Sequence, residues 1–159
     1  MARLHRLEMR QILQTDLRET WDFFQSPLNL RAITPDWLDF EVISDVPRDM
    51  YPGLMIEYRV RPLAGLRSRW VTEITHVRAP HYFVDEQRVG PYRMWHHEHV
   101  FNEVNGGVEV VDRVSYVLPF GPLGNLAHAA FVGKRLNTIF THRRKVLAQR
   151  FGELEQAAD

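Results

Sequence analysis

The chain has 159 residues, a usual length for one domain and enough to bury a core with a pocket inside it. Its 20 basic and 20 acidic side chains balance, so the composition gives no electrostatic reason to expect binding to nucleic acid or to an anionic membrane. Cysteine is absent, which excludes disulfides, thiolate metal ligands and cysteine nucleophiles, and fits a reducing compartment.

The N-terminal part predicts a strand followed by two short helices. Residues 3–13 alternate charged and apolar side chains without an unbroken apolar stretch, so we expect a strand, no signal peptide, no integral membrane segment and a cytoplasmic location. Asp16 followed by Glu19 is the capping-box pattern of a first helix. Pro27 begins a second helix, where its missing N–H costs nothing, and Pro35 ends it.

The rest of the chain predicts a meander of six strands and then one long helix. Turns that contain proline or glycine separate strands at 38–44, 54–61, 67–77, 82–88, 92–104 and 108–118. Apolar residues at helical intervals predict a helix over 123–154. We therefore expect one domain over 1–155, with a dispensable tail at 156–159.

The predicted fold is α+β, with a curved, seven-stranded antiparallel sheet around the C-terminal helix. A sheet with one polar face must bury its other face, and the long helix is the predicted element large enough to cover it. A strongly curved sheet cannot close completely onto a cylinder, so a pocket lined by inward side chains remains between them.

A hairpin around Asn105-Gly106 carries acid–base side chains on an apolar face. Asn-Gly between two alternating segments favours a type I′ turn, because both residues tolerate positive φ. With those two residues as the loop, His99 faces Asp112. By the same register, Trp95 faces Tyr116 on the apolar side of the hairpin.

Several motifs occur in an order that resembles the bacterial ligand-binding branch of the START-like, or SRPBCC, helix-grip superfamily. They are FFQSPLNLRAITPDW (23–37), MYPGLMIEY (50–58), WVTEI (70–74), FVDEQRVGPYRMWHHEHVF (83–101) and DRVSYVLPFGPLG (112–124). That superfamily includes polyketide cyclases and aromatases, coenzyme Q-binding proteins and the birch-pollen allergen. The resemblance implies a cavity that binds a hydrophobic molecule such as a lipid, a quinone or a polyketide.

The residues expected to bind the ligand lie on the inward strand faces and on the long helix. They are Tyr58, Trp70, Glu73, Asp85, Gln87, Tyr92, Trp95, His97, His99, Phe101, Asp112, Tyr116, Ala130 and Gly133. Four of them are also the candidates for catalysis: His97, His99, Asp112 and Tyr116.

The two histidines allow three interpretations. Two-residue spacing on a strand places the His97 and His99 rings about 7 Å apart on one face. With Asp112 they resemble a two-histidine, one-carboxylate metal site, although we expect neither a metal nor another cofactor. In the second interpretation they are pocket polarity, with His99 donating to Asp112 and His97 bonded to Tyr116, Tyr92 or water. In the third, one histidine is a general acid or base.

The turn at Ala79-Pro80 leaves the face of Glu73 open. A two-residue loop would place Trp70, Thr72 and Ile74 on the face of Asp85 and Gln87. One residue more would place Val71, Glu73 and Thr75 there instead. The first alternative leaves Glu73 on the solvated face of the sheet.

We expect the protein to bind a hydrophobic small molecule without chemistry. The alternatives are a cyclase, aromatase or dehydratase that uses a cavity histidine, and a quinone chaperone or protein-interaction module. Leu63, Leu66 and Leu123 are apolar residues at predicted loop tips, where transient contact with a membrane is possible. The sequence does not predict the ligand or the oligomeric state.

Overall fold

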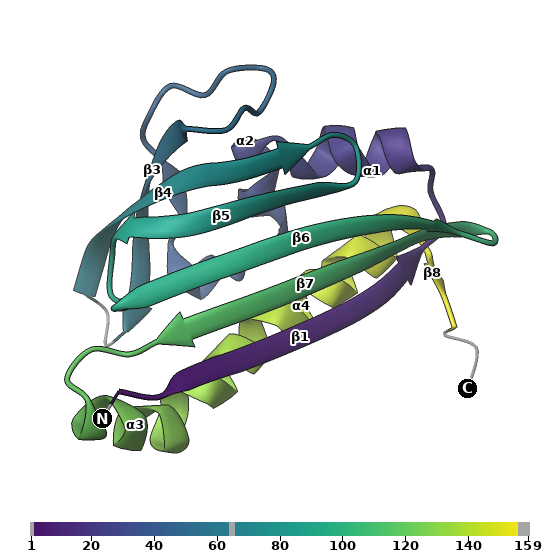
Figure 1. The fold of residues 1–159 in the computed structure, drawn as a ribbon. Coiled ribbons are helices and arrows are strands. Elements are labelled where there is room, and N and C mark those ends of the chain that lie inside the picture. The colour runs from purple at the N-terminus through teal and green to yellow at the C-terminus, as the bar shows by residue number, and fades with distance from the viewer. Residues whose placement is uncertain (1, 64–65, 156–159) are drawn as a thin grey trace.

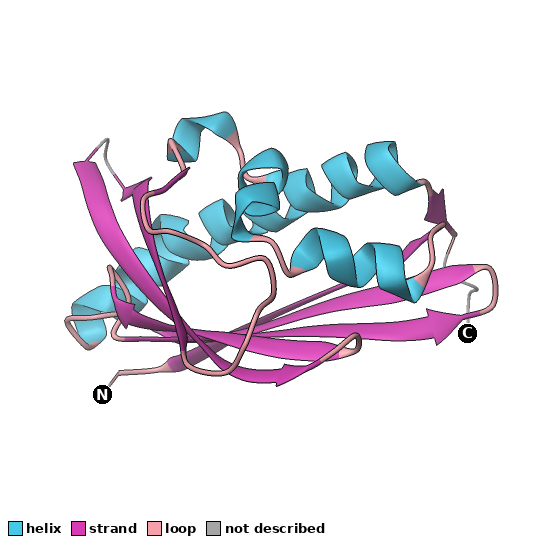
Figure 2. Cartoon of the chain, turned by 90° about the horizontal axis from the view of Figure 1, so that it is seen from above, coloured by secondary structure: helices cyan, strands magenta, loops and turns pink. Residues whose placement is uncertain are grey.

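The computed structural model describes residues 2–63 and 66–155, with no side-chain description at positions 62–66. The tail predicted at 156–159 lies outside the described residues. One curved antiparallel sheet forms one layer, and the helices form a second layer on its concave face (Figures 1 and 2). Among the described residues, no helix combines the length and the apolar character needed to cross a membrane.

The elements follow the order that the sequence predicts. In chain order they are β1 (Leu4–Leu13), α1 (Leu17–Phe24), α2 (Pro27–Leu30), the 3₁₀ turns η1 (Arg31–Ile33) and η2 (Asp36–Leu38), β2 (Glu41–Val42), β3 (Leu54–Leu63), β4 (Leu66–Arg78), β5 (Tyr82–Val89), β6 (Met94–Val104), β7 (Gly107–Val117), α3 (Pro122–Ala127), the π turn η3 (His128–Val132), α4 (Gly133–Phe151) and β8 (Glu153–Leu154). The sheet order is β2-β3-β4-β5-β6-β7-β1-β8. The six-strand meander is therefore confirmed, and β1 pairs with its last strand.

The C-terminal helix differs from the continuous helix predicted over 123–154. It contains the π turn η3, and it ends at Phe151. Gly152 adopts a φ of 78°, which a residue with a side chain rarely adopts, and this turns the chain out of the helix. Glu153–Leu154 then pairs with β1 as an eighth strand. Periodicity alone does not detect one inserted helical residue or a pairing of two residues.

The register of the predicted β6–β7 hairpin is confirmed, but the predicted type I′ turn is wrong, because Gly106 has a φ of 85° whereas the φ of Asn105 is not positive. Val104 pairs with Gly107, and the register continues to the predicted pairs of Trp95 with Tyr116 and of His99 with Asp112. Side chains on the predicted inward faces of both strands are buried. The hydrophobic pattern and the Asn-Gly turn therefore specify the same register.

Helix α4 packs on the concave face of the sheet and closes two groups of buried side chains. Leu147 is 1% exposed and belongs to the group that contains Phe101 and α1 residues such as Trp21. Leu136 and Phe140 pack in the other group with Trp95 and Tyr116 of the hairpin. Leu136, Phe140 and Arg143 of this helix also line the cavity described below.

We expect Leu147→Ala to lower the free energy of unfolding by about 2–5 kcal/mol, because it removes buried methyl groups and leaves a void that the structure fills only in part. Chemical denaturation followed by circular dichroism measures the change. Leu126→Ala is the matched control, since that leucine is 67% exposed and its loss should change stability little. Equal losses in the two variants would contradict the assignment of the core.

Candidate functional site

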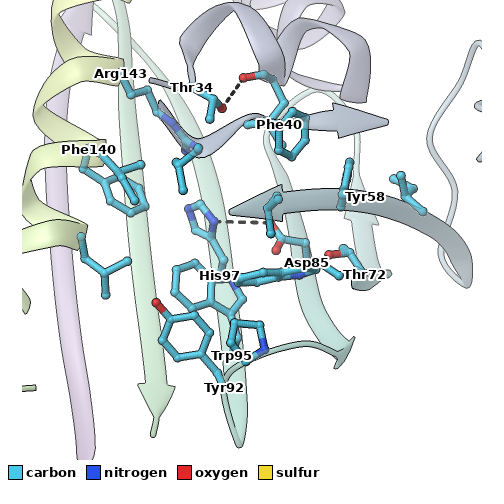
Figure 3. Close-up of a pocket in the computed structure, with 18 of the residues that line it drawn as sticks. Thr34, Phe40, Tyr58, Thr72, Asp85, Tyr92, Trp95, His97, Phe140 and Arg143 are labelled. Atoms are coloured by element: carbon cyan, nitrogen blue, oxygen red, sulfur yellow. Dashed lines mark hydrogen bonds and ion pairs between the residues drawn. The ribbon is translucent and has the colours of Figure 1, made fainter. Parts of the chain in front are cut away.

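A cavity of about 390 Å³ lies between the sheet and α4, in the size range of small-molecule pockets. Its lining is mainly apolar and comes from β3 to β6, α1, α2, the loop after β7, and α3 to α4. Seven of the predicted ligand-binding residues line it: Tyr58, Trp70, Asp85, Tyr92, Trp95, His97 and His99. Figure 3 shows Tyr92 and Trp95 on one side of the space and His97 pointing toward Asp85.

Four ionisable side chains of the sheet converge at one side of this cavity. Asp85 is directly opposite His97 on the neighbouring strand, and Asp112 is directly opposite His99. Both of these opposed pairs have N···O distances of 3.4 Å. The shorter contacts are diagonal: His99 Nε2 is 2.6 Å from Asp85 Oδ2, and His97 Nε2 is 2.8 Å from Asp112 Oδ1. Each histidine therefore lies between the two carboxylates.

Helix α4 contributes a fifth member, Arg143. Its Nη1 donates to Asp112 Oδ1 at 3.2 Å, and the side chain of Arg143 is only 9% exposed. Asp112 is equally enclosed, whereas Asp85 keeps 18% of its side-chain surface and lines the cavity. Asp112 thus lies behind the histidines, and Asp85 lies in front of them. We call these five residues, Asp85, His97, His99, Asp112 and Arg143, the ionisable cluster.

The surroundings assign a charge to each member of the cluster. Burial alone would raise the pKa of Asp112, but the Arg143 guanidinium and the two histidines hold it well below its usual range. The pKa of Asp85 is also lowered, because the attraction of His97 and His99 exceeds the effect of its burial. Both residues are therefore carboxylates at neutral pH.

The pKa values of the two histidines shift in opposite directions. Burial and the nearby His99 charge lower the pKa of His97 below its usual value, despite both carboxylates. Burial opposes the charge of His99 as well, but its contacts with Asp112 and Asp85 raise its pKa overall. These shifts favour the neutral form of His97 and the protonated form of His99; in that state two negative charges meet two positive ones, and the cluster has no net charge.

The predicted hydrogen bonds of the histidines are wrong, although the strand register is right. His97 bonds to Asp112 rather than to Tyr116, Tyr92 or water, and the nearest carboxylate of His99 is Asp85. The ring centroids are 3.8 Å apart instead of about 7 Å. Diagonal neighbours are within reach of long side chains, and both rings lean into the space between the carboxylates.

The placement of Glu73 in the site is also wrong. The turn at Ala79-Pro80 has three residues between the paired Arg78 and Tyr82, but a bulge at Thr75 then shifts the register of β4. The bulge exchanges the two faces, so Trp70 and Thr72 line the cavity. Glu73 lies on the outer face, where it forms an ion pair with Arg88.

Six other predicted residues do not line the cavity. The side chain of Gln87 bonds to the backbone N–H and carbonyl of Tyr92 and so fixes the turn before β6. Phe101 is fully buried in the core, and Tyr116 Oη bonds to His128 Nε2 at 2.7 Å. The remaining three predicted residues are also absent from the cavity lining, each for a different reason. Asp112 lies behind the histidines; Ala130 is exposed; Gly133 faces the His128 ring, 3.1 Å from where its Cβ would be.

Sequence reasoning missed Arg143. The apolar positions Leu136, Phe140 and Leu147 recur at helical spacing, and Arg143 falls on the same face, three residues after Phe140 and four before Leu147. A lone arginine in such an apolar stripe was the available signal, because a buried guanidinium requires a carboxylate partner.

Comparison with known proteins shows the fold and not the activity. No family model matches the chain, and no curated protein matches its sequence. The chain resembles the structures of protein Ms6760 from Mycobacterium smegmatis (17% identity, 91% of this chain and 92% of that one, TM-score 0.64) and of protein CV1439 from Chromobacterium violaceum (12%, 93% and 98%, 0.70). It also resembles Ara h 8.0201 (12% identity, 92% and 99%, TM-score 0.60). The fold is therefore a helix grip, an open antiparallel sheet around a long C-terminal helix.

We expect Asp112→Asn to lower the free energy of unfolding at pH 7 by about 3–5 kcal/mol, because the change leaves the buried Arg143 charge without its partner. In the wild type the unfolded chain binds the Asp112 proton first as the pH falls, since the folded pKa is the lower one. Stability should therefore be lost progressively below about pH 5, and the variant should lose less over that range. Urea unfolding at a series of pH values measures both effects.

Asp39→Asn is the control for this prediction. Asp39 also pairs with two arginines, Arg61 and Arg67, but it is 41% exposed, and exposed ion pairs add little to stability. An Asp112 variant that is as stable as the Asp39 variant, with an unchanged pH profile, would contradict the role of Asp112 in the cluster.

Proposed function

We propose that this protein binds a hydrophobic small molecule in the cavity between the sheet and α4. The observation that supports the proposal is an apolar cavity with a polar, ionisable wall at one side. The Trp70, Tyr92 and Trp95 rings pack against one another along the lining, with centroids 4.9 to 5.6 Å apart. Such an aromatic wall favours a flat or chain-like ligand.

The ionisable cluster would fix the polar end of the ligand. Asp85 supplies acceptor oxygens toward the cavity, and Arg143 also reaches its lining. A cluster built only for stability would satisfy all its members, yet Arg143 Nε is buried without a hydrogen-bond partner among the described residues. Because Arg143 lines the cavity, this favours recognition of a polar group on the ligand over a purely structural role.

The entrance supports uptake from an apolar environment. Phe120 and Leu123 line the cavity, but they are 82% and 72% exposed, on the loop after β7 and at the start of α3. Exposed apolar side chains beside a pocket favour transient contact with a membrane or a delivery partner, and this includes a quinone-chaperone role. The side chains of Leu63 and Leu66, predicted to share this contact, lie outside the described residues.

We expect Ile139→Trp to weaken binding of 1-anilinonaphthalene-8-sulfonate by about tenfold or more, because Ile139 lines the cavity and the larger ring would fill it. Fluorescence titration measures the affinity. Thr138→Trp is the matched control, since its neighbouring side chain is exposed on α4 and should leave binding unchanged.

Native mass spectrometry of the freshly purified wild type then looks for a bound molecule. A panel of oleate, decylubiquinone, progesterone and an aromatic polyketide tests which class raises the melting temperature. The proposal would be refuted if the wild type carries no bound molecule, if no compound raises its melting temperature, and if both tryptophan variants bind the dye equally.

A second candidate is a cyclase, aromatase or dehydratase-type enzyme. One observation favours it: His97 lines the cavity with its pKa lowered, so that it is a free base near neutral pH, and a carboxylate orients it from behind. His97 would then remove a proton from a carbonyl compound, and the protonated His99 would supply one.

For the catalytic candidate, His97→Ala and His99→Ala should abolish turnover of a poly-ketone substrate and leave its affinity largely intact. Product formation by mass spectrometry and affinity by fluorescence quenching separate the two effects. Parallel losses of turnover and affinity in both variants would assign the histidines to binding alone.

A further inference from the structure

The front of the ionisable cluster brings three metal-ligating side chains together. One donor atom from each of Asp85, His97 and His99 lies within 4.8 Å of the other two. Asp85 is on β5 and the histidines are on β6, so two paired strands hold all three donors. We propose that Asp85, His97 and His99 bind a divalent transition-metal ion at the wall of the cavity.

The contacts of Asp112 behind the histidines favour the tautomers that such a site requires. Asp112 accepts from His97 Nε2 at 2.8 Å and lies 3.4 Å from His99 Nδ1. Protons on those two nitrogens leave the lone pairs of His97 Nδ1 and His99 Nε2 directed toward Asp85. A carboxylate behind each ligating histidine is the usual outer partner in metal sites, because it fixes the ring and increases its basicity.

The donor atoms of the three side chains face the same space in front of the histidines. His97 Nδ1 is 3.4 Å from Asp85 Oδ2, and His99 Nε2 is 2.6 Å from the same oxygen. A metal ion bound by all three atoms would take the place of the hydrogen bond between His99 and Asp85, and the proton of that bond would be released.

The distances fit a small ion after a modest adjustment. Bonds of about 2.1 Å in a tetrahedral site separate neighbouring ligand atoms by roughly 3.4 Å. The His97–Asp85 distance already has that value, and the shorter His99–Asp85 contact has to lengthen. Two imidazoles and one carboxylate suit Zn²⁺ or Fe²⁺ rather than Ca²⁺ or Mg²⁺, which prefer oxygen ligands only.

Charge balance indicates what would occupy the remaining position. With a divalent ion and two neutral histidines, Asp85, Asp112 and Arg143 leave the cluster with one net positive charge. The open position faces the cavity, because all three ligands line it. If the proposed function holds, an anionic oxygen of the ligand, as in a carboxylate or an enolate, would bind there and neutralise the site.

The experiment uses untagged full-length protein, treated with a chelator and then titrated with Zn²⁺ by calorimetry and with Co²⁺ by visible absorption. We expect one ion per chain and intense d–d bands of tetrahedral Co²⁺. Asp85→Asn and His99→Ala should weaken binding by more than about 100-fold, and Asp112→Asn by about 10–100-fold. Circular dichroism verifies that each variant is folded.

Two histidine variants outside the site are the matched controls. His96 lies on the outer face beside Glu86, and His128 stacks on His5 at 3.7 Å near α3. His96→Ala and His128→Ala should bind the metal like the wild type. Absence of stoichiometric binding to the wild type, or equal losses in the control variants, would overturn the metal site even if a ligand-site variant failed to fold.

The metal site and the proposed function can fail separately. Dye binding by the wild type is measured with and without EDTA. Uptake of 1-anilinonaphthalene-8-sulfonate without any metal binding refutes the metal site and leaves the cavity as a binding site. Stoichiometric metal without uptake of any apolar compound supports the metal site and refutes the proposed ligand class.

Discussion

The site depends on the ionic interactions of the buried Asp112 carboxylate with the histidines and Arg143. An isolated charge in a protein interior is too costly to keep, so it must be neutralised by partners that are themselves buried. Asp112 has such partners on both sides, with the histidines of β6 across the strand pair and Arg143 from α4. The carboxylate therefore joins the sheet to the helix electrostatically, in addition to the apolar contacts around it.

This ion pair also explains why the space beside it is available to a ligand. Helix α4 is anchored by Leu147 in one group of buried residues and by Leu136 and Phe140 in the other. Arg143 lies between these anchors and reaches down to Asp112, so that the helix is supported there by a long side chain instead of close packing. The sheet also curves around the helices (Figure 2), and the cavity lies between its concave face and α4.

The parts of the fold that could be predicted are those in which local signals agree. The Asn105-Gly106 turn and the alternation of β6 and β7 independently give one register, so the pairing of His99 with Asp112 followed from sequence. The face of Glu73 did not follow, because the bulge at Thr75 exchanges the two faces of β4 and leaves no local pattern. Likewise, strand pairing shows which residues are opposed, whereas the tilt of two long rings toward diagonal partners depends on side-chain packing. An arginine in an apolar helical stripe indicates a buried partner, but only the folded structure identifies that partner as Asp112.

Binding, proton transfer and metal coordination make different demands on the same few atoms. What distinguishes them is the occupant of the gap between Asp85 and His97, since Asp112 and Arg143 play the same part in each case. A proton on His99 alone leaves the cluster neutral, which suits an uncharged ligand that offers a hydroxyl to Asp85. A metal ion in the gap leaves it positive, which selects an anionic oxygen. Under the proposed function, the charge of the cluster would therefore select the charge of the ligand, and the apolar lining would select the remainder of its chemistry.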